Sequence, residues 1–262
     1  MFEVVKLPLV LPVAFANVNP AQLLRDKLST RYAILGDEIP DVGIFVGAIA
    51  AKSTLNVCPK IFTISVFFIV RGFGHVAMGE KMFALSPQSA FIPSFQKHFK
   101  ITGSQNLPLE YLEFELVVTL QEAMDLEATA HILPYTIEYV HCMTYTEDIK
   151  SDKSVNRTLV GHNIIPRFCM GSVESTGFDE VRVHSHPILE QLFFGLENNH
   201  CVITAGNDEF PFGASVLCHV PLGCDHGVTV APGHKLHYLW IDFFKDREGV
   251  DYIGKMHLHS PI

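Results

Sequence analysis

The chain has 262 residues, of which 48% are hydrophobic and 18% charged, and its formal net charge is −9. This length suits one large domain or two smaller ones, and the hydrophobic content excludes a disordered chain or a coiled coil. The negative net charge argues against a nucleic-acid partner. Twelve of the fourteen histidines lie at or after position 131, so the two halves of the chain are expected to differ in chemistry.

The cysteines and the apolar segments indicate a cytoplasmic protein without a membrane anchor. Six cysteines form no CxxC pair, which in a chain of this size is typical of reduced thiols. No apolar run reaches about 18 residues, so neither a transmembrane helix nor a membrane partner is predicted. Residues 1–18 resemble a secretory signal, but Glu3 offsets Lys6 and two prolines interrupt the run, which favours an N-terminal strand.

In chain order, the pattern predicts few helices and many short strands, as in an all-β sandwich or barrel. Helices are expected in the AQLLRDKL segment after Pro20 and, more weakly, over residues 120–128. The polar stretch Thr146–Arg157 is interpreted as a linker. The predicted strands are Ile61–Val70, His75–Met78, Tyr111–Leu120, Tyr135–Tyr139, Val181–His186, Leu192–Phe194, Cys201–Ala205, Ala214–Val220, Gly227–Val230 and Leu236–Phe244.

An internal repeat divides the chain into two copies of one all-β unit. Residues 67–102 align with residues 193–229 with few gaps, and a YLEFELVV or YLWIDFFK segment follows each. The matched positions are Phe67 and Phe193, Phe68 and Phe194, Gly79 and Gly206, Pro93 and Pro221, and His98 and His226. The repeat predicts an N-terminal domain over residues 1–145 and a C-terminal domain over residues 146–262.

The sharpest motif is HSHPILE, which begins at His184, followed downstream by PLGCDH, which ends at His226. In a strand, residues i and i+2 point to the same face, so His184 and His186 are expected to project together. A short turn after Pro187 is expected to bring Glu190 beside them, and His226 opens the next strand. Three imidazoles and one carboxylate suit a divalent first-row metal, namely Mn, Fe, Ni, Zn or Co, with open coordination positions.

The spacing HxH-x3-E followed by PxG-xx-H resembles the two signature motifs of the cupin superfamily. Gly177 lies seven rather than six positions before the first histidine, Gly195 follows the glutamate at five rather than seven positions, and Val230 replaces the usual Asn. The resemblance covers residues 165–245 and, through the repeat, residues 45–118. It implies tandem cupin barrels, a double-stranded β-helix or jelly-roll architecture, and hence a bicupin.

The N-terminal copy lacks the ligand set, since Cys58 and His98 are the only ligand-type residues at the matching positions. That copy is interpreted as a degenerate, structural barrel, and one metal is expected in the C-terminal barrel. Arg182 lies two residues before His184, so it is a candidate clamp for a substrate anion inside the barrel mouth. The alternative is an ion pair of Arg182 at the barrel rim.

The residues favour a metal-dependent enzyme that acts on a small polar ligand, carboxylate- or sugar-like, by Lewis-acid chemistry of isomerase, lyase or hydrolase type. An Fe-dependent cupin dioxygenase is one alternative, and a metal-containing small-molecule binding or sensor protein is another. Candidates for a general base are His219, His234 and His237, each of which is alternatively a surface or supporting residue. The β-rich edges are compatible with a homodimer.

Overall fold

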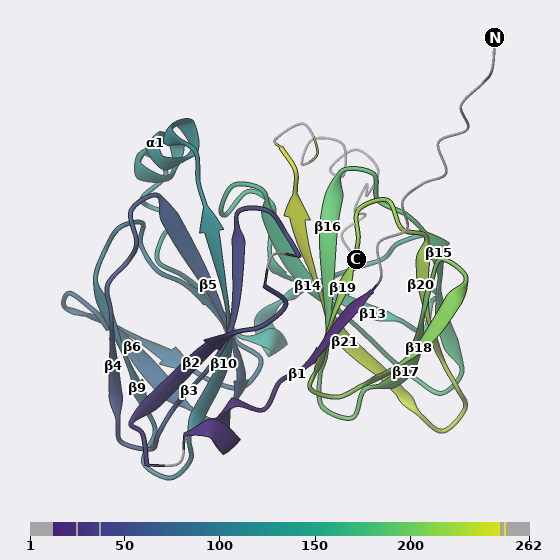
Figure 1. Cartoon of the computed structure of the whole chain (residues 1–262), viewed down its shortest axis with the longest axis horizontal. Coiled ribbons are helices and arrows are strands. Elements are labelled where there is room, and N and C mark those ends of the chain that lie inside the picture. The colour runs from purple at the N-terminus through teal and green to yellow at the C-terminus, as the bar shows by residue number, and fades with distance from the viewer. Residues whose placement is uncertain (1–12, 25, 37, 247–248, 250–262) are drawn as a thin grey trace.

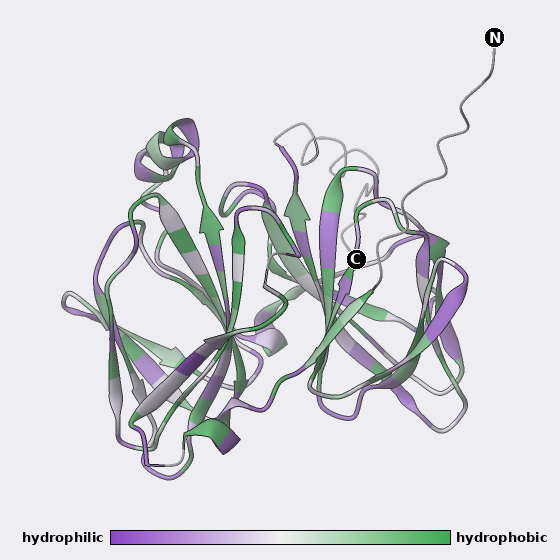
Figure 2. Cartoon of the chain, viewed as in Figure 1, coloured by the Kyte–Doolittle hydropathy of each residue, from purple (hydrophilic) through white to green (hydrophobic). Residues whose placement is uncertain are grey.

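The structure is a computed structural model of the chain, and it describes residues 13–24, 26–36, 38–246 and 249. Its regular elements are mostly strands, arranged in four antiparallel sheets (Figure 1). Hydrophobic and hydrophilic residues alternate in bands along these strands (Figure 2), as expected where one face of each sheet covers a core. The all-β prediction is confirmed.

Two of the sheets form the N-terminal barrel. A six-stranded sheet has the order β11-β8-β5-β10-β3-β2, and a four-stranded sheet has the order β4-β9-β6-β7. The strands are β2 (Ser29–Ala33), β3 (Val42–Ile49), β4 (Thr54–Val57), β5 (Thr63–Arg71), β6 (Gly74–Met78), β7 (Lys81–Leu85), β8 (Ala90–Ile92), β9 (Phe99–Gly103), β10 (Leu109–Val117) and β11 (Tyr135–Ile137).

The other two sheets form the C-terminal barrel and repeat the same strand order. A seven-stranded sheet has the order β1-β19-β16-β21-β14-β13-β12, and a four-stranded sheet has the order β15-β20-β17-β18. The strands are β1 (Ala14–Asn17), β12 (Met143–Tyr145), β13 (Val155–Val160), β14 (Phe168–Thr176), β15 (Asp179–His184), β16 (Leu189–Gly195), β17 (His200–Ala205), β18 (Asp208–Gly213), β19 (Val216–Val220), β20 (His226–Val230) and β21 (Lys235–Phe244).

One edge strand crosses between the barrels. β1, near the start of the chain, pairs with β19 of the C-terminal barrel, whereas β11 pairs with β8 of its own, N-terminal barrel. The remaining strands of each large sheet come from one stretch of chain. The predicted N-terminal strand therefore exists in part, over Ala14–Asn17, while residues 1–12 lie outside the described residues. The domain boundary after residue 145 stays a prediction.

The large sheets of the two barrels pack face to face and share one hydrophobic core. In this core the rings of Phe68 and Phe194 lie 6.3 Å apart, and those of Phe114 and Phe243 lie 5.9 Å apart. The neighbouring Phe67 and the repeat partner Phe193 face the opposite way, each into the interior of its own barrel. Alternation along a strand thus explains why a Phe-Phe pair occurs in both copies.

Helices are few, as expected. α1 (Leu120–Ala128) begins with a capping box between Thr119 and Glu122, which explains its start within the predicted range. The helix expected after Pro20 is only a 3-10 turn, η1 (Pro20–Leu23), and a second such turn is η2 (Tyr139–His141). None of the helices in the described part of the chain is long and apolar enough to cross a membrane.

Candidate metal centre

Two strands of the small C-terminal sheet bring three histidines together. His184 ends β15 and lies opposite His226, which begins β20, while His186 follows in the adjoining turn. The ring centroids of His184 lie 4.4 Å from His226 and 4.8 Å from His186, and the other pair lies 5.5 Å apart. Within the described residues, this is the group whose ligand atoms all lie within 4.8 Å of one another.

Hydrogen bonds fix the orientation of two of these rings. Nδ1–H of His184 donates to the carbonyl of Arg182 at 2.8 Å, and Nδ1–H of His226 donates to the carbonyl of Cys224 at 2.9 Å. A carbonyl can only accept, so Nε2 of each ring carries the lone pair. Burial, with a smaller effect of His184, lowers the pKa of His226 to about 4, so this ring is neutral near pH 7.

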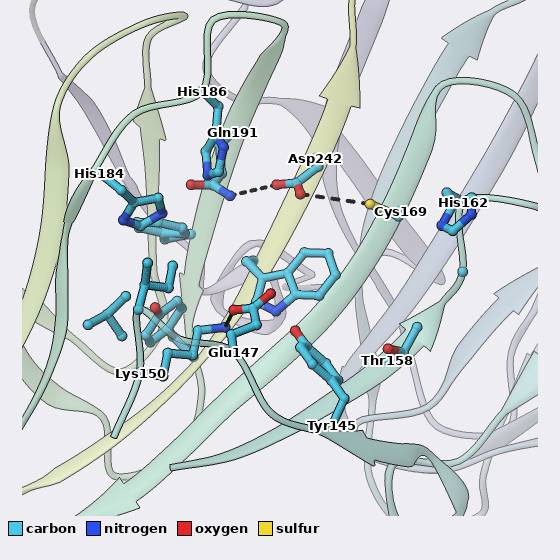
Figure 3. Close-up of a pocket in the computed structure, with 16 residues that line it drawn as sticks. Tyr145, Glu147, Lys150, Thr158, His162, Cys169, His184, His186, Gln191 and Asp242 are labelled. Carbon is cyan, nitrogen blue, oxygen red and sulfur yellow. Dashed lines mark hydrogen bonds and ion pairs between the residues drawn. The ribbon is translucent and has the colours of Figure 1, made fainter. Parts of the chain in front are cut away.

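Gln191 on β16 lies beside His184 and His186 in the wall of one cavity (Figure 3). Its Nε2 donates to Oδ1 of Asp242 at 2.7 Å, an arrangement that requires the amide NH2 to face the carboxylate. The amide oxygen Oε1 is buried without a hydrogen-bond partner, as is Nε2 of His226. Buried acceptors normally find a partner, so two orphaned lone pairs beside a histidine cluster fit a bound cation.

Glu190, the predicted fourth ligand, lies elsewhere. Its Oε2 accepts from Nε2 of His219 at 3.0 Å and from the backbone N–H of Leu222 at 2.9 Å. The reason is the phase of β16, since Glu190 shares its face with Leu192, which packs into the core between the barrels. Contrary to the prediction, Glu190 thus faces away from the histidines, and the next residue, Gln191, lines the cavity instead.

Arg182 does not reach the cavity, contrary to the predicted anion clamp. A β-bulge lies between Val181 and His184, so these two residues face the interior although they are three positions apart. Arg182, between them, is exposed, and its guanidinium donates to the carbonyl of Asp148. The i, i+2 rule therefore fails on this side of the histidine pair.

The cavity has a volume of about 80 Å³. By the volume that a water centre needs, this space holds a ligand of roughly five to eight non-hydrogen atoms. Its other lining residues come mostly from β12, β13, β14, β21 and the loop before β13, and include Tyr145, Glu147, Ile149, Lys150, Thr158, His162, Cys169, Tyr238, Trp240 and Asp242. The sequence did not indicate Gln191, Glu147, Lys150 or Asp242 as site residues.

Asp242 anchors the wall behind Gln191. Besides the amide, its Oδ2 accepts from the thiol of Cys169 at 3.7 Å. Burial, together with the Asp242 charge, raises the pKa of Cys169 well above its ordinary value, so the thiol stays protonated and donates. Asp242 thus holds the Gln191 amide with its oxygen turned toward the histidines.

The three candidate bases do not line this cavity. His219 is buried between the carboxylates of Glu190 and Glu38, at 3.0 and 3.2 Å. His234 stacks on His200, and His237 contacts the hydroxyl of Tyr139 and the carbonyl of Glu197. Each of these histidines therefore has a supporting contact outside the cavity.

Aromatic rings fill much of the interior of the N-terminal barrel. Phe99 lies 5.8 Å from Phe67 and 6.0 Å from Phe91, centroid to centroid. Cys58 and His98 are both exposed. The cavity of this barrel is smaller, about 30 Å³, and Glu113 in its wall pairs with Arg31 at 2.7 Å.

No protein-family model and no curated protein sequence matches the chain, but solved structures match its fold. A cupin 2 conserved barrel domain protein from Leptotrichia buccalis is 13% identical with a TM-score of 0.59, covering 83% of this chain and 89% of its own. A Pseudomonas aeruginosa protein described as glyoxylate-induced is 11% identical with a TM-score of 0.69, covering 87% of each chain.

The oxalate decarboxylase of Lactobacillus farciminis, solved as a formate complex, is 12% identical with a TM-score of 0.61, covering 82% of this chain and 81% of its own. The chain has the cupin fold. At such low identity the likeness to other cupins concerns the fold alone, and the role of each residue rests on the geometry described above.

Proposed function

We propose that this cupin is a metal-dependent enzyme that acts on a small polar metabolite, carboxylate- or sugar-like, by Lewis-acid chemistry of isomerase, lyase or hydrolase type. The observation that carries the proposal is the cluster of three imidazoles, two of which line a cavity together with Gln191, whose Oε1 is buried without a hydrogen-bond partner. His184, His186, His226 and Gln191 would hold one divalent Mn, Fe, Ni, Zn or Co ion. Such an ion polarises a bound oxygen.

All four proposed ligands are neutral, which distinguishes this centre from one with a glutamate. The ion would keep its full double charge, compensated in part by the carboxylate of Asp242 behind Gln191. A centre of this charge attracts an anionic ligand more strongly than a centre with a carboxylate ligand. The composition of the site therefore favours an acid or an enolisable oxygen compound as substrate.

The residues around the centre supply positioning. The carbonyls of Arg182 and Cys224 hold two imidazoles by Nδ1, and Asp242 holds the Gln191 amide. Trp240 contributes an aromatic ring to the wall of the cavity. A homodimer, a cytoplasmic location and the absence of a nucleic-acid partner stay predictions from the sequence.

Turnover tests the proposal. Purified chain loaded separately with each of the five metals is assayed on keto acids, hydroxy acids, uronates, ureides and phenolic acids, with oxygen uptake recorded in parallel. Turnover without oxygen uptake, lost in His186→Ala, supports the Lewis-acid proposal. Turnover that consumes oxygen with Fe alone identifies the dioxygenase alternative, and saturable binding without turnover identifies a binding protein.

A further inference from the structure

The loop before β13 forms part of the cavity wall and is fixed to the strand that carries His184. The backbone N–H of Arg182 donates to the carbonyl of Ile149 at 2.9 Å, and Lys150 forms an antiparallel bridge with Val181. The guanidinium of Arg182 adds a bond to the carbonyl of Asp148. A stretch of sequence that reads as a linker is thus held in a defined position beside the candidate metal centre.

This loop contributes a buried ion pair to the cavity. Nζ of Lys150 lies 2.5 Å from Oε2 of Glu147, and their side chains are only 6% and 11% exposed. Nζ also lies 5.5 Å from the ring centroid of Tyr145. Figure 3 shows both side chains of the pair among the residues that line the space below His184 and Gln191.

A buried ion pair rarely improves stability over an apolar replacement, because desolvation offsets the attraction. The Lys150–Glu147 pair lies in a cavity wall, so a role in ligand recognition explains it better than a role in stabilising the fold. An ammonium has three N–H donors and a carboxylate has about four lone-pair sites. Because each group can contact more than one partner, the ion pair does not exclude a contact of either side chain with a ligand.

The charge of the lining limits what this ligand can be. The carboxylates of Glu147 and Asp242 and the ammonium of Lys150 together carry a formal charge of −1, which a divalent cation changes to +1. A ligand with one negative charge then neutralises the cavity. A ligand with two leaves an uncompensated charge in a largely buried space, which is costly.

We propose that Lys150 and Glu147 recognise the end of the ligand that does not contact the metal, and that this end is an uncharged group with an acceptor beside an N–H or O–H donor, such as a carboxamide. The ligand is then a small acid with a single negative charge, of a size that fits the cavity. This inference rests on the proposed function, whose substrate class it narrows.

Trp240 provides a direct reporter, since it is the only tryptophan of the chain and it lines the cavity. Its fluorescence is titrated in the Zn-loaded chain with malonamate and with malonate, which have equal numbers of non-hydrogen atoms. We expect malonamate to bind roughly 10- to 100-fold tighter, the range of a hydrogen bond to a charged group. Monomethyl malonate, a monoanion without an N–H donor, should bind roughly tenfold more weakly than malonamate.

The charge-altering variant Glu147→Gln should reverse the preference toward malonate, because it raises the charge of the loaded cavity by one. Asp152→Asn, a neutralisation on an exposed part of the same loop, is the matched control and should retain the wild-type preference. Thermal unfolding checks that each variant folds. The comparison of malonamate with monomethyl malonate uses the wild-type chain alone, so it tests the inference even if a variant fails to fold.

Any of three results overturns the inference. The wild-type chain binds malonate more tightly than malonamate, it binds monomethyl malonate and malonamate equally, or Glu147→Gln keeps the wild-type preference. Metal analysis separates this result from failure of the proposed function. If the chain binds no metal, the proposed function fails, and the inference that rests on it fails as well. If the chain binds metal and gives one of these three results, the inference alone is overturned.

Discussion

Substitutions at the neighbouring positions Glu190 and Gln191 separate the sequence-based ligand assignment from the structural one. Gln191→Leu removes an amide oxygen from the cavity and leaves Asp242 without its 2.7 Å hydrogen bond. Loss of a supporting partner alone typically lowers metal affinity about 10- to 100-fold. Loss of the ligand together with its contact to Asp242 should therefore cost at least that much, which corresponds to about 1.4–2.8 kcal/mol.

Glu190→Gln should leave metal affinity unchanged and lower stability instead. The Glu190 carboxylate accepts hydrogen bonds from the buried His219 and from the N–H of Leu222. A neutral amide accepts these hydrogen bonds less strongly, which should lower the free energy of unfolding by about 1.5–3 kcal/mol. For a chain of this size that corresponds to a fall in melting temperature of roughly 3–12 °C.

Both effects are measured on the same preparations. Metal affinity is obtained by titrating metal-free protein with Zn²⁺ against a competing chelator, and stability by thermal unfolding of the metal-free protein. If Glu190→Gln loses metal affinity while Gln191→Leu retains it, β16 presents its opposite face to the metal, and Glu190 is the ligand.

Three further predictions concern the protonation of His226, the hydrophobic core shared by the barrels, and Arg182, the residue predicted to hold a substrate anion. The metal-free chain should lose on the order of 3 kcal/mol of unfolding free energy as pH falls from 6.5 to 4, measured by urea denaturation, because buried His226 has a pKa of about 4 whereas its ordinary value is 6.5. Between pH 4 and 6.5 the unfolded chain binds one more proton than the folded chain, at His226. His226→Asn should therefore reduce the dependence of the unfolding free energy on pH, and a variant with the wild-type dependence would contradict the low pKa of His226. Phe114→Ala, in the core shared by the barrels, should cost about 3–5 kcal/mol in urea unfolding, whereas the exposed control Phe62→Ala should cost under about 0.5 kcal/mol. Arg182→Met should leave metal and ligand affinity unchanged but speed amide exchange over residues 147–150; a large loss of ligand affinity would restore the clamp interpretation.

The sequence predicts the fold well because the strand periodicity is strong and repeated. The pair Phe67 and Phe68 and its counterpart Phe193 and Phe194 occupy matching strands, each with one ring in a barrel and one between the barrels. The pairing of β1 with the C-terminal barrel could not be predicted, since pairing between distant segments leaves no local pattern. The three clustered histidines were predicted because their spacing survives small changes of the backbone.

The remaining site residues depend on the exact phase of two strands. The turn between His186 and β16 can direct either Glu190 or Gln191 into the barrel interior. Glu190 was the expected ligand because a carboxylate is the more usual metal ligand. The bulge after Val181 turned Arg182 outward, and bulges of this kind have no clear sequence signal here. A shift of one residue reverses the faces of a strand, so both errors have the same origin.

Lys150 and Glu147 were missed for a different reason. A run of polar and charged residues is usually a solvated connection, and the segment at 146–157 has that composition. Its burial arises from contacts with β15, in particular the bond from Arg182 to the carbonyl of Ile149. Such long-range contacts cannot be inferred from the composition of the loop itself.

One metal ion is proposed to bind to His184, His186, His226 and Gln191. Element analysis of the purified chain, loaded with metal and then dialysed, measures this binding, with His186→Ala as the comparison. We expect close to one equivalent of a first-row divalent metal per wild-type chain, and a small fraction of that in the variant. A wild-type chain that retains none, or a variant that retains as much as the wild type, would contradict it.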